Sequence, residues 1–146
     1  MNYLDTSALI KRFVAEQGSD VVDALVVADE PVATAKIAYA EVYSGLTRKR
    51  RERQVSEGAY RSACRRFEAE WRAWVQVELS DEVLRLARDV IRRRALRGFD
   101  AIHLASALGL KTRLGENVTF AAADARLLGA ARGEGLRPLN VETESP

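Results

Sequence analysis

Short apolar runs alternate with longer segments of helical period along the chain, and this alternation constrains the fold more than any other feature. Apolar runs separated by amphipathic segments are typical of parallel strands that helices connect. A parallel sheet needs cover on both of its faces. We therefore expect an α/β protein with a central parallel sheet of about five strands, at residues 1–4, 31–34, 75–79, 118–122 and 136–141.

The length of the chain suits one domain with a substantial core. It has 146 residues, of which 47% are hydrophobic, and a chain of this size normally folds around one core. We expect a single domain over residues 1–146, in which residues 142–146 form a frayed tail. Pro138 predicts that the last strand lies at an edge of the sheet. Gly98 predicts the C-terminal end of the helix that begins after Ser80.

Charge and composition exclude several classes of protein. The formal net charge is only +2, so the chain is not a basic coat for nucleic acid. No apolar run approaches the roughly 20 residues of a membrane span, and we expect no signal peptide ahead of the first strand. The single cysteine, Cys64, excludes an internal disulfide and favours a reducing compartment. We expect a cytoplasmic protein without a membrane partner.

Four acids occupy positions that deserve a chemical explanation. Asp5 follows the first expected strand and Asp124 the fourth, at the edge of the sheet where ligands of open α/β sheets bind. Glu41 interrupts an apolar helical face, and Asp100 lies one turn before another such face. Each acid also has a simpler interpretation. The three aspartates could cap helices, and Glu41 could pair with a neighbouring Lys or Arg.

Considered together, the four carboxylates can converge at one edge of the sheet. Close carboxylates repel one another and raise each other's pKa unless a cation lies between them. Oxygen ligands suit hard ions such as Mg²⁺ or Mn²⁺, which polarise phosphates and activate water. The local chemistry therefore predicts hydrolysis of a phosphate ester, and clusters of arginine favour a nucleic acid as the substrate. The only histidine, His103, is expected to be a hydrogen-bonded core residue.

The segments that hold these acids resemble the PIN-domain ribonucleases, most closely the VapC toxins of bacterial toxin–antitoxin pairs. They occur in the family's order along essentially the whole chain: YLDTSAL at Asp5, AYAEVYSGL at Glu41, LRGFDAIHLASAL at Asp100 and FAAADARLLGAARGEGL at Asp124. The resemblance implies a three-layer α/β/α PIN-like fold and a metal-dependent endoribonuclease. Its catalytic residues, which would hold Mg²⁺ or Mn²⁺ directly or through water, are Asp5, Glu41, Asp100 and Asp124.

The resemblance also implies support for the site and two kinds of protein contact. Thr6 and Ser7 would support the acids, the chain would form a homodimer, and a small antitoxin would fill the acidic pocket with a basic residue. Ala122 departs from the family, which often has threonine two residues before the fourth acid, so a hydroxyl near the metal is missing. RNA contacts are expected at a basic helix end that antitoxin or dimer contacts would also use: Arg48, Lys49, Arg50 and Arg51.

Three alternatives stay open at this point. A PIN nuclease of RNA maturation would carry the same acids but have no antitoxin. A receiver-like phospho-acceptor module also gathers acids at strand ends, but it needs a lysine at a later strand end, and we expect none here. A metal-dependent phosphatase needs a second acid two residues after its nucleophilic aspartate, where this chain has Ser7. The sequence favours an endoribonuclease toxin.

Overall fold

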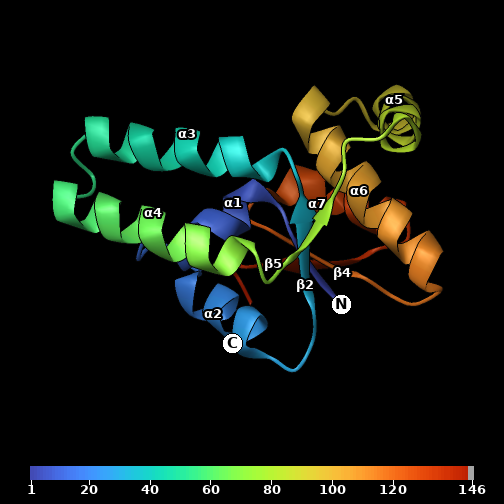
Figure 1. Cartoon of the computed structure of the whole chain (residues 1–146). Helices are drawn as coiled ribbons and strands as arrows, with labels where there is room; N and C mark the ends of the chain where they lie inside the picture. Colours follow the sequence, from blue (N-terminus) through green and yellow to red (C-terminus); the bar gives the residue numbers. More distant parts are fainter. Residues whose placement is uncertain (145–146) are drawn as a thin grey trace.

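A five-stranded parallel sheet forms the centre of the protein (Figure 1). The structure, a computed structural model, describes residues 1–144. The strand order is β3-β2-β1-β4-β5, so β1 is central. From β1 the chain adds β2 and β3 on one side of the sheet, and it then returns to add β4 and β5 on the other side. The predicted sheet is confirmed, with strands β1 (Asn2–Leu4), β2 (Val32–Ala35), β3 (Val75–Val77), β4 (Thr119–Ala122) and β5 (Arg137–Asn140).

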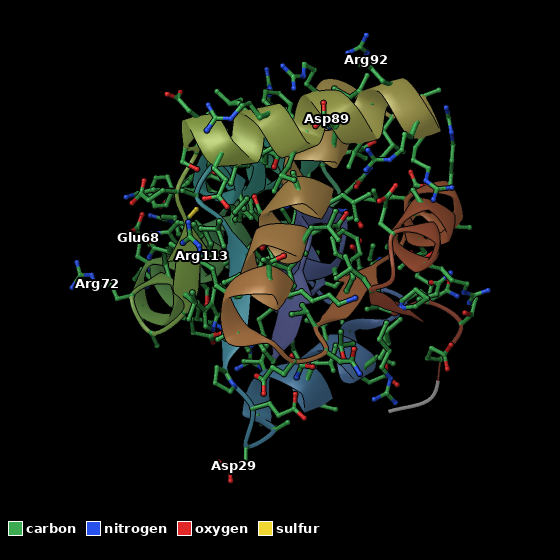
Figure 2. The ribbon with its side chains drawn as sticks, turned by 90° about the vertical axis from the view of Figure 1, so that its right-hand side faces the viewer. Asp29, Glu68, Arg72, Asp89, Arg92 and Arg113 are labelled. Carbon is green, nitrogen blue, oxygen red and sulfur yellow. The ribbon has the colours of Figure 1, made fainter. Side chains whose placement is uncertain are left out.

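Helices cover both faces of this sheet, which confirms the predicted three-layer α/β/α fold. The first layer consists of α5 (Asp81–Arg94), α6 (Gly98–Leu114) and α7 (Ala125–Gly133). In this layer α5 lies across α6, as Figure 2 shows. The second layer consists of α1 (Thr6–Leu9), the 3₁₀ turn η1 (Ile10–Arg12), α2 (Ser19–Val27), α3 (Ala38–Arg51) and α4 (Glu57–Trp71). Within residues 1–144, no helix combines the length and apolar character that crossing a bilayer requires.

The alternation of side chains along the central strand divides the core between the two layers. Tyr3 and Leu4 are both fully buried, but Tyr3 packs in the cluster beneath α6 and Leu4 in the cluster beneath α3. Tyr3 stands in register with Phe120 of β4, and their rings stack with centroids 5.4 Å apart. Pro138 lies in β5, which pairs only with β4, so the predicted edge position is confirmed.

The end of α5 differs from the prediction. The helix ends at Ala95, which adopts a left-handed conformation with φ of 52°, while Gly98 begins α6. Left-handed backbone normally favours glycine, which explains why the sequence pointed to Gly98. The next helix also continues beyond the expected residue 110, because the first left-handed glycine after it is Gly115, with φ of 67°.

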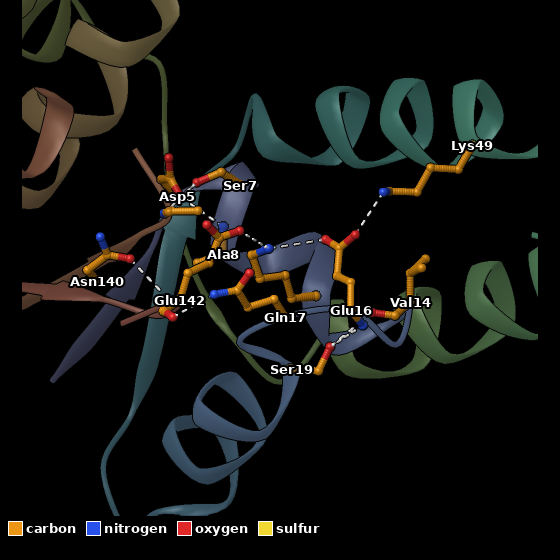
Figure 3. A network of polar contacts seen from close by, with 12 residues as sticks. Asp5, Ser7, Ala8, Val14, Glu16, Gln17, Ser19, Lys49, Asn140 and Glu142 are labelled. Atoms are coloured by element: carbon orange, nitrogen blue, oxygen red, sulfur yellow. Dashed lines mark hydrogen bonds and ion pairs between the residues drawn. The ribbon is translucent and has the colours of Figure 1, made fainter. Parts of the chain in front are cut away.

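Glu142, the first residue of the expected tail, contacts two side chains near the start of the chain. Glu142 accepts a hydrogen bond from the buried Lys11 at 2.7 Å, and its backbone oxygen accepts one from Gln17 at 2.9 Å. Lys11 also pairs with Glu16 at 3.3 Å. Figure 3 shows the polar network to which Glu142 and Glu16 belong. A lysine that is only 6% exposed needs partners for its charge, and Glu142 supplies one. Residues 145 and 146 lie outside the described part.

Gly18 and Gly115 provide a matched test of how closely the C-terminal segment packs. Both have positive φ, 87° and 67°, but a Cβ at Gly18 would collide with the Val141 carbonyl, whereas one at Gly115 would meet nothing within 4 Å. We expect Gly115→Ala to lower the free energy of unfolding by about 1 kcal/mol, from backbone strain alone. Gly18→Ala should cost more than about 2 kcal/mol, because overpacking adds to that strain. Denaturant titration measures both, and equal losses would contradict the close packing.

Candidate active site

Two of the four acids lie at the carboxyl edge of the sheet, where the strand order reverses. Asp5 follows β1 directly, Asp124 follows β4 after one residue, and these two strands are neighbours. In open α/β sheets such a switch point leaves a crevice between the connections, and ligands bind there. The fold therefore brings together acids that are more than a hundred residues apart in the chain.

Asp5 is buried and held by short contacts. It is 5% exposed, and its Oδ1 accepts hydrogen bonds from the Ser7 hydroxyl at 2.7 Å and the Ala8 amide at 3.0 Å. It thus caps α1, as its simpler interpretation anticipated. The Ser7 hydroxyl also accepts the Ala123 amide at 3.0 Å, so it joins the end of β1 to the end of β4. Burial raises the pKa of Asp5 despite these bonds and the opposing effect of His103, and the nearby charge of Asp100 adds a smaller increase.

Glu41 is held by residues from both helical layers. His103 Nε2 donates to Glu41 Oε1 at 2.7 Å, and the Thr6 hydroxyl donates to the same oxygen at 2.7 Å. With Nε2 as donor, Nδ1 of a neutral imidazole accepts from the Tyr3 hydroxyl at 2.9 Å. Partial burial opposes ionisation of Glu41, but the bonds from His103 and Thr6 outweigh it and lower its pKa. His103 is buried and bonded as predicted, and it also orients an acid of the site.

Asp100 and Asp124 line one small hollow of about 20 Å³ between α6 and α7. Such a volume admits about one water molecule or one ion. Asp124 caps α7 by accepting the Arg126 and Leu127 amides at 2.8 and 3.2 Å, whereas Asp100 lies in the first turn of α6 and caps nothing. Partial burial, and then the charge of Asp124, raise the pKa of Asp100. The two carboxylates repel each other across a space that a cation would fit.

Arginines surround the same hollow. Arg97 and Arg126 line it, and Arg126 donates to the Ala95 carbonyl at 2.9 Å. Arg97 was not expected at the site, although its basic cluster with Arg93 and Arg94 is visible in the sequence. Those two neighbours both pair with Glu134 at 3.0 Å, so only part of the cluster faces the acids.

The carboxylates do not form a complete coordination shell by themselves. Within residues 1–144, no three His, Cys, Asp or Glu side chains lie close enough together to hold one ion. Mg²⁺ in proteins usually keeps several waters and binds only one or two carboxylates directly. The oxygen donors, the raised pKa values of Asp5 and Asp100 and the ion-sized hollow fit a hard divalent ion that is held partly through water.

At the basic end of α3, two of the four expected RNA contacts have partners within the protein and two are accessible. Lys49 pairs with Glu16 at 2.9 Å (Figure 3), and the Arg50 guanidinium lies 4.3 Å from the centre of the Tyr60 ring. Arg48 and Arg51 are exposed and belong to none of the ion pairs formed within residues 1–144. These two are the accessible cations of the four expected RNA contacts.

Two further expectations can be compared with the structure. Ala122 is fully buried in the core beneath α6, and the hydroxyls that reach the acids come from Thr6 and Ser7 instead. Our expectation of no lysine at a strand end was wrong, because Lys36 follows β2 directly. Its ammonium pairs with Glu78 at 2.5 Å, at the outer strand β3, and does not bond Asp5.

Repulsion at Asp100 predicts a stabilising substitution in metal-free protein. The pKa of Asp100 is higher in the folded protein than in the unfolded chain, so ionised Asp100 destabilises the fold above that pKa. This destabilisation disappears at acidic pH, where Asp100 is protonated in both the folded and the unfolded state. We expect Asp100→Asn to raise the unfolding free energy at pH 7 in EDTA by about 0.5–1 kcal/mol, a value limited by solvent screening. The gain should vanish below about pH 4.

Asp81 provides the matched control, because it lies in the first turn of α5 and is exposed. Asp81→Asn should lower stability by a few tenths of a kcal/mol, since it loses only its attraction to the helix dipole. Thermal unfolding of both variants separates the two effects. A destabilised Asp100→Asn protein that matches Asp81→Asn would contradict the repulsion.

The chain is similar to proteins of one known family. The PIN domain family matches residues 3–132. Ribonuclease VapC45 and Ribonuclease VapC49 of Mycobacterium tuberculosis are each 37% identical to this chain over 108 residues, which is 74% of this chain and 75% of either relative.

Solved structures share the fold at lower identity. A toxin–antitoxin complex from Klebsiella pneumoniae aligns with a TM-score of 0.70 at 16% identity, over 97% of this chain and 98% of that chain. FitAcB from Neisseria gonorrhoeae aligns with a TM-score of 0.68 at 17% identity, over 99% of this chain and 100% of that chain. The family match and the 37% identity together establish that this chain belongs to the PIN-domain family, in the group of the VapC ribonucleases.

Proposed function

We propose that this chain is an endoribonuclease toxin of a toxin–antitoxin pair and cuts RNA with the help of Mg²⁺ or Mn²⁺. The observation that carries the proposal is the group of mutually repelling carboxylates around the edge between β1 and β4. Burial and the charge of neighbouring carboxylates raise the pKa values of both Asp5 and Asp100. A bound cation would favour the ionised forms of these two acids and offset their repulsion. Membership among the VapC ribonucleases supports RNA as the substrate.

Each acid has a distinct part in the proposed reaction. Asp5, Asp100 and Asp124 would hold the ion, directly or through water. When bound, the ion polarises the phosphate and lowers the pKa of a water. Glu41 keeps its negative charge because His103 and Thr6 donate to it, so it orients the attacking water and accepts its proton.

The remaining polar groups position these acids and the substrate. Ser7 holds Asp5 against the end of β4. Arg97 and Arg126, beside Asp100 and Asp124, attract the phosphate that the carboxylates alone would repel. The chemistry is hydrolysis: the water oxygen bonds to phosphorus and the bond from phosphorus to the leaving ribose oxygen breaks.

The partner that we propose is a small antitoxin with a basic residue at the acidic edge. The related folds include a toxin–antitoxin complex and VapBC2 of Rickettsia felis, the latter with a TM-score of 0.64 at 14% identity over 96% of this chain and 98% of that chain. An arginine placed between Asp100 and Asp124 would relieve the repulsion that otherwise calls for an ion. We also propose that two copies of this chain form a homodimer and that the protein acts in the cytoplasm.

Substitution of the acids and removal of the ion test the reaction. Asp5→Asn and Asp100→Asn should each reduce RNA cleavage by at least about 100-fold, because electrostatic stabilisation of the transition state is lost. EDTA should stop wild-type cleavage, and added Mg²⁺ or Mn²⁺ should restore it. Gel analysis of labelled RNA measures the rate, and circular dichroism confirms that the variants fold. Cleavage that EDTA leaves unchanged would refute the metal, and an active Asp100→Asn protein would remove that residue from the mechanism.

Substitution of His103 should lower the rate of RNA cleavage through its hydrogen bond to Glu41. His103→Leu removes the donor to Glu41 and should lower cleavage by about 10- to 100-fold, the range found for groups that orient the residues of a metal site. His103→Gln retains an N–H donor and should recover part of the rate. RNA affinity in EDTA should stay unchanged in both. Equal loss in the two variants would indicate that His103 contributes packing and not the orientation of Glu41.

A further inference from the structure

A second and larger hollow opens next to the acids, on the side of α3. It has a volume of about 600 Å³ and lies between α1, α3 and the start of α6. Glu41, Ser44 and Arg48 line it at intervals of three and four residues, so they form one stripe along α3. The stripe extends for about 10 Å, from the acid that orients water to an accessible arginine. The hollow therefore continues directly from the proposed reaction centre.

Phe99 stands at the mouth of this hollow and is unusually accessible for its type. Its side chain is 60% exposed, although the residue directly precedes Asp100. An isolated exposed aromatic residue needs no explanation, but this one borders a hollow that apolar residues such as Ile10 and Ile37 line together with polar ones. A flat apolar ring at the entrance of such a space suits a flat ligand.

The lining offers three kinds of contact that an unpaired nucleotide needs. Phe99 supplies a face for stacking, the hydroxyl of Ser44 can bond the edge of a base, and Arg48 supplies a cation for a phosphate. Proteins recognise single-stranded RNA with this combination, because splayed bases stack on aromatic rings while their edges stay accessible. Arg48 belongs to no ion pair within the described part of the chain, so its charge is available.

We propose that the hollow is a nucleobase subsite, in which Phe99 stacks on an unpaired base beside the cleaved phosphodiester and Arg48 binds the adjacent phosphate. This inference rests on the proposed nuclease function and adds the form of RNA that the site accepts. A base in the hollow places its own phosphate near Glu41 and the acids, so recognition and cleavage are adjacent. The subsite selects RNA that can turn a base out of its stack at the cleavage point.

A thermodynamic cycle that combines a substitution of Phe99 with removal of the bases from the probe measures the stacking contact. The Asp100→Asn protein serves as the background, because it removes one repelling carboxylate and leaves the RNA intact. The probes are fluorescein-labelled oligoadenylate and oligouridylate, each compared with an abasic ribose-phosphate chain of the same length and charge. In this background we add Phe99→Leu, which keeps an apolar side chain without a flat face, or Phe99→Tyr, which keeps the ring. Fluorescence anisotropy gives each affinity.

The background protein should bind at least one base-bearing probe about 5- to 10-fold more tightly than the abasic chain, since one stacked base contributes on this scale. Phe99→Leu should lose that preference, Phe99→Tyr should keep it, and affinity for the abasic chain should be the same in all three. Arg48→Gln should weaken all probes alike, because its contact is to phosphate.

An unchanged preference in Phe99→Leu would overturn the subsite, and so would a background protein that does not distinguish the probes. If Phe99→Leu leaves RNA binding unchanged but releases a small protein that co-purifies with wild type, the hollow belongs to a protein partner instead. These outcomes are distinct from failure of the nuclease proposal, which would be absence of metal-dependent cleavage by the wild-type chain.

Discussion

The buried carboxylate of Asp5, at the end of the central strand, is the constraint on which the site depends. Ionisation in a buried position is unfavourable unless hydrogen bonds and opposite charge compensate it. Ser7 and the Ala8 amide supply the bonds, and Ser7 in turn joins the strand ends of β1 and β4. These contacts do not fully offset the burial, so the pKa of Asp5 stays raised, and the charge of Asp100 adds to that effect. In the proposed function, this raised pKa and the repulsion from Asp100 are the physical reason to expect a divalent ion or a basic antitoxin residue at the site.

Two polar networks connect the helical layers to this edge. On the side of α6, His103 connects Tyr3 of β1 to Glu41 of α3, so an acid from one layer is oriented by a residue from the other. On the opposite side, buried Lys11 connects Glu16 and Glu142, which ties the C-terminal segment to η1 (Figure 3). Both networks satisfy charges that would otherwise be costly to bury. They make the position of the acids a property of the whole fold.

Particular residues show how far sequence reasoning extends. The position of Asp5 and Asp124 after apolar strands was predictable, because the carboxyl ends of parallel strands share one edge. The end of α5 was not, since Ala95 takes a left-handed conformation that local preference assigns to glycine. Lys49 belonged to a basic run in the sequence, yet it pairs with Glu16, a residue of a distant loop. Pairing between remote side chains leaves no periodic signal along the chain.

The sequence by itself determined the class of fold and the strand edge at which Asp5 and Asp124 lie, and it supplied the chemical reason to propose a hard ion there. Strand and helix periods and the hardness of carboxylate oxygens are local properties, so residues near one another in the chain encode them. Only the tertiary structure decided that Glu41 is held by His103, that Arg48 stays accessible while Lys49 does not, and that Phe99 borders a hollow beside the acids. These features depend on which faces of α1, α3 and α6 meet, and packing across the whole molecule sets that relation.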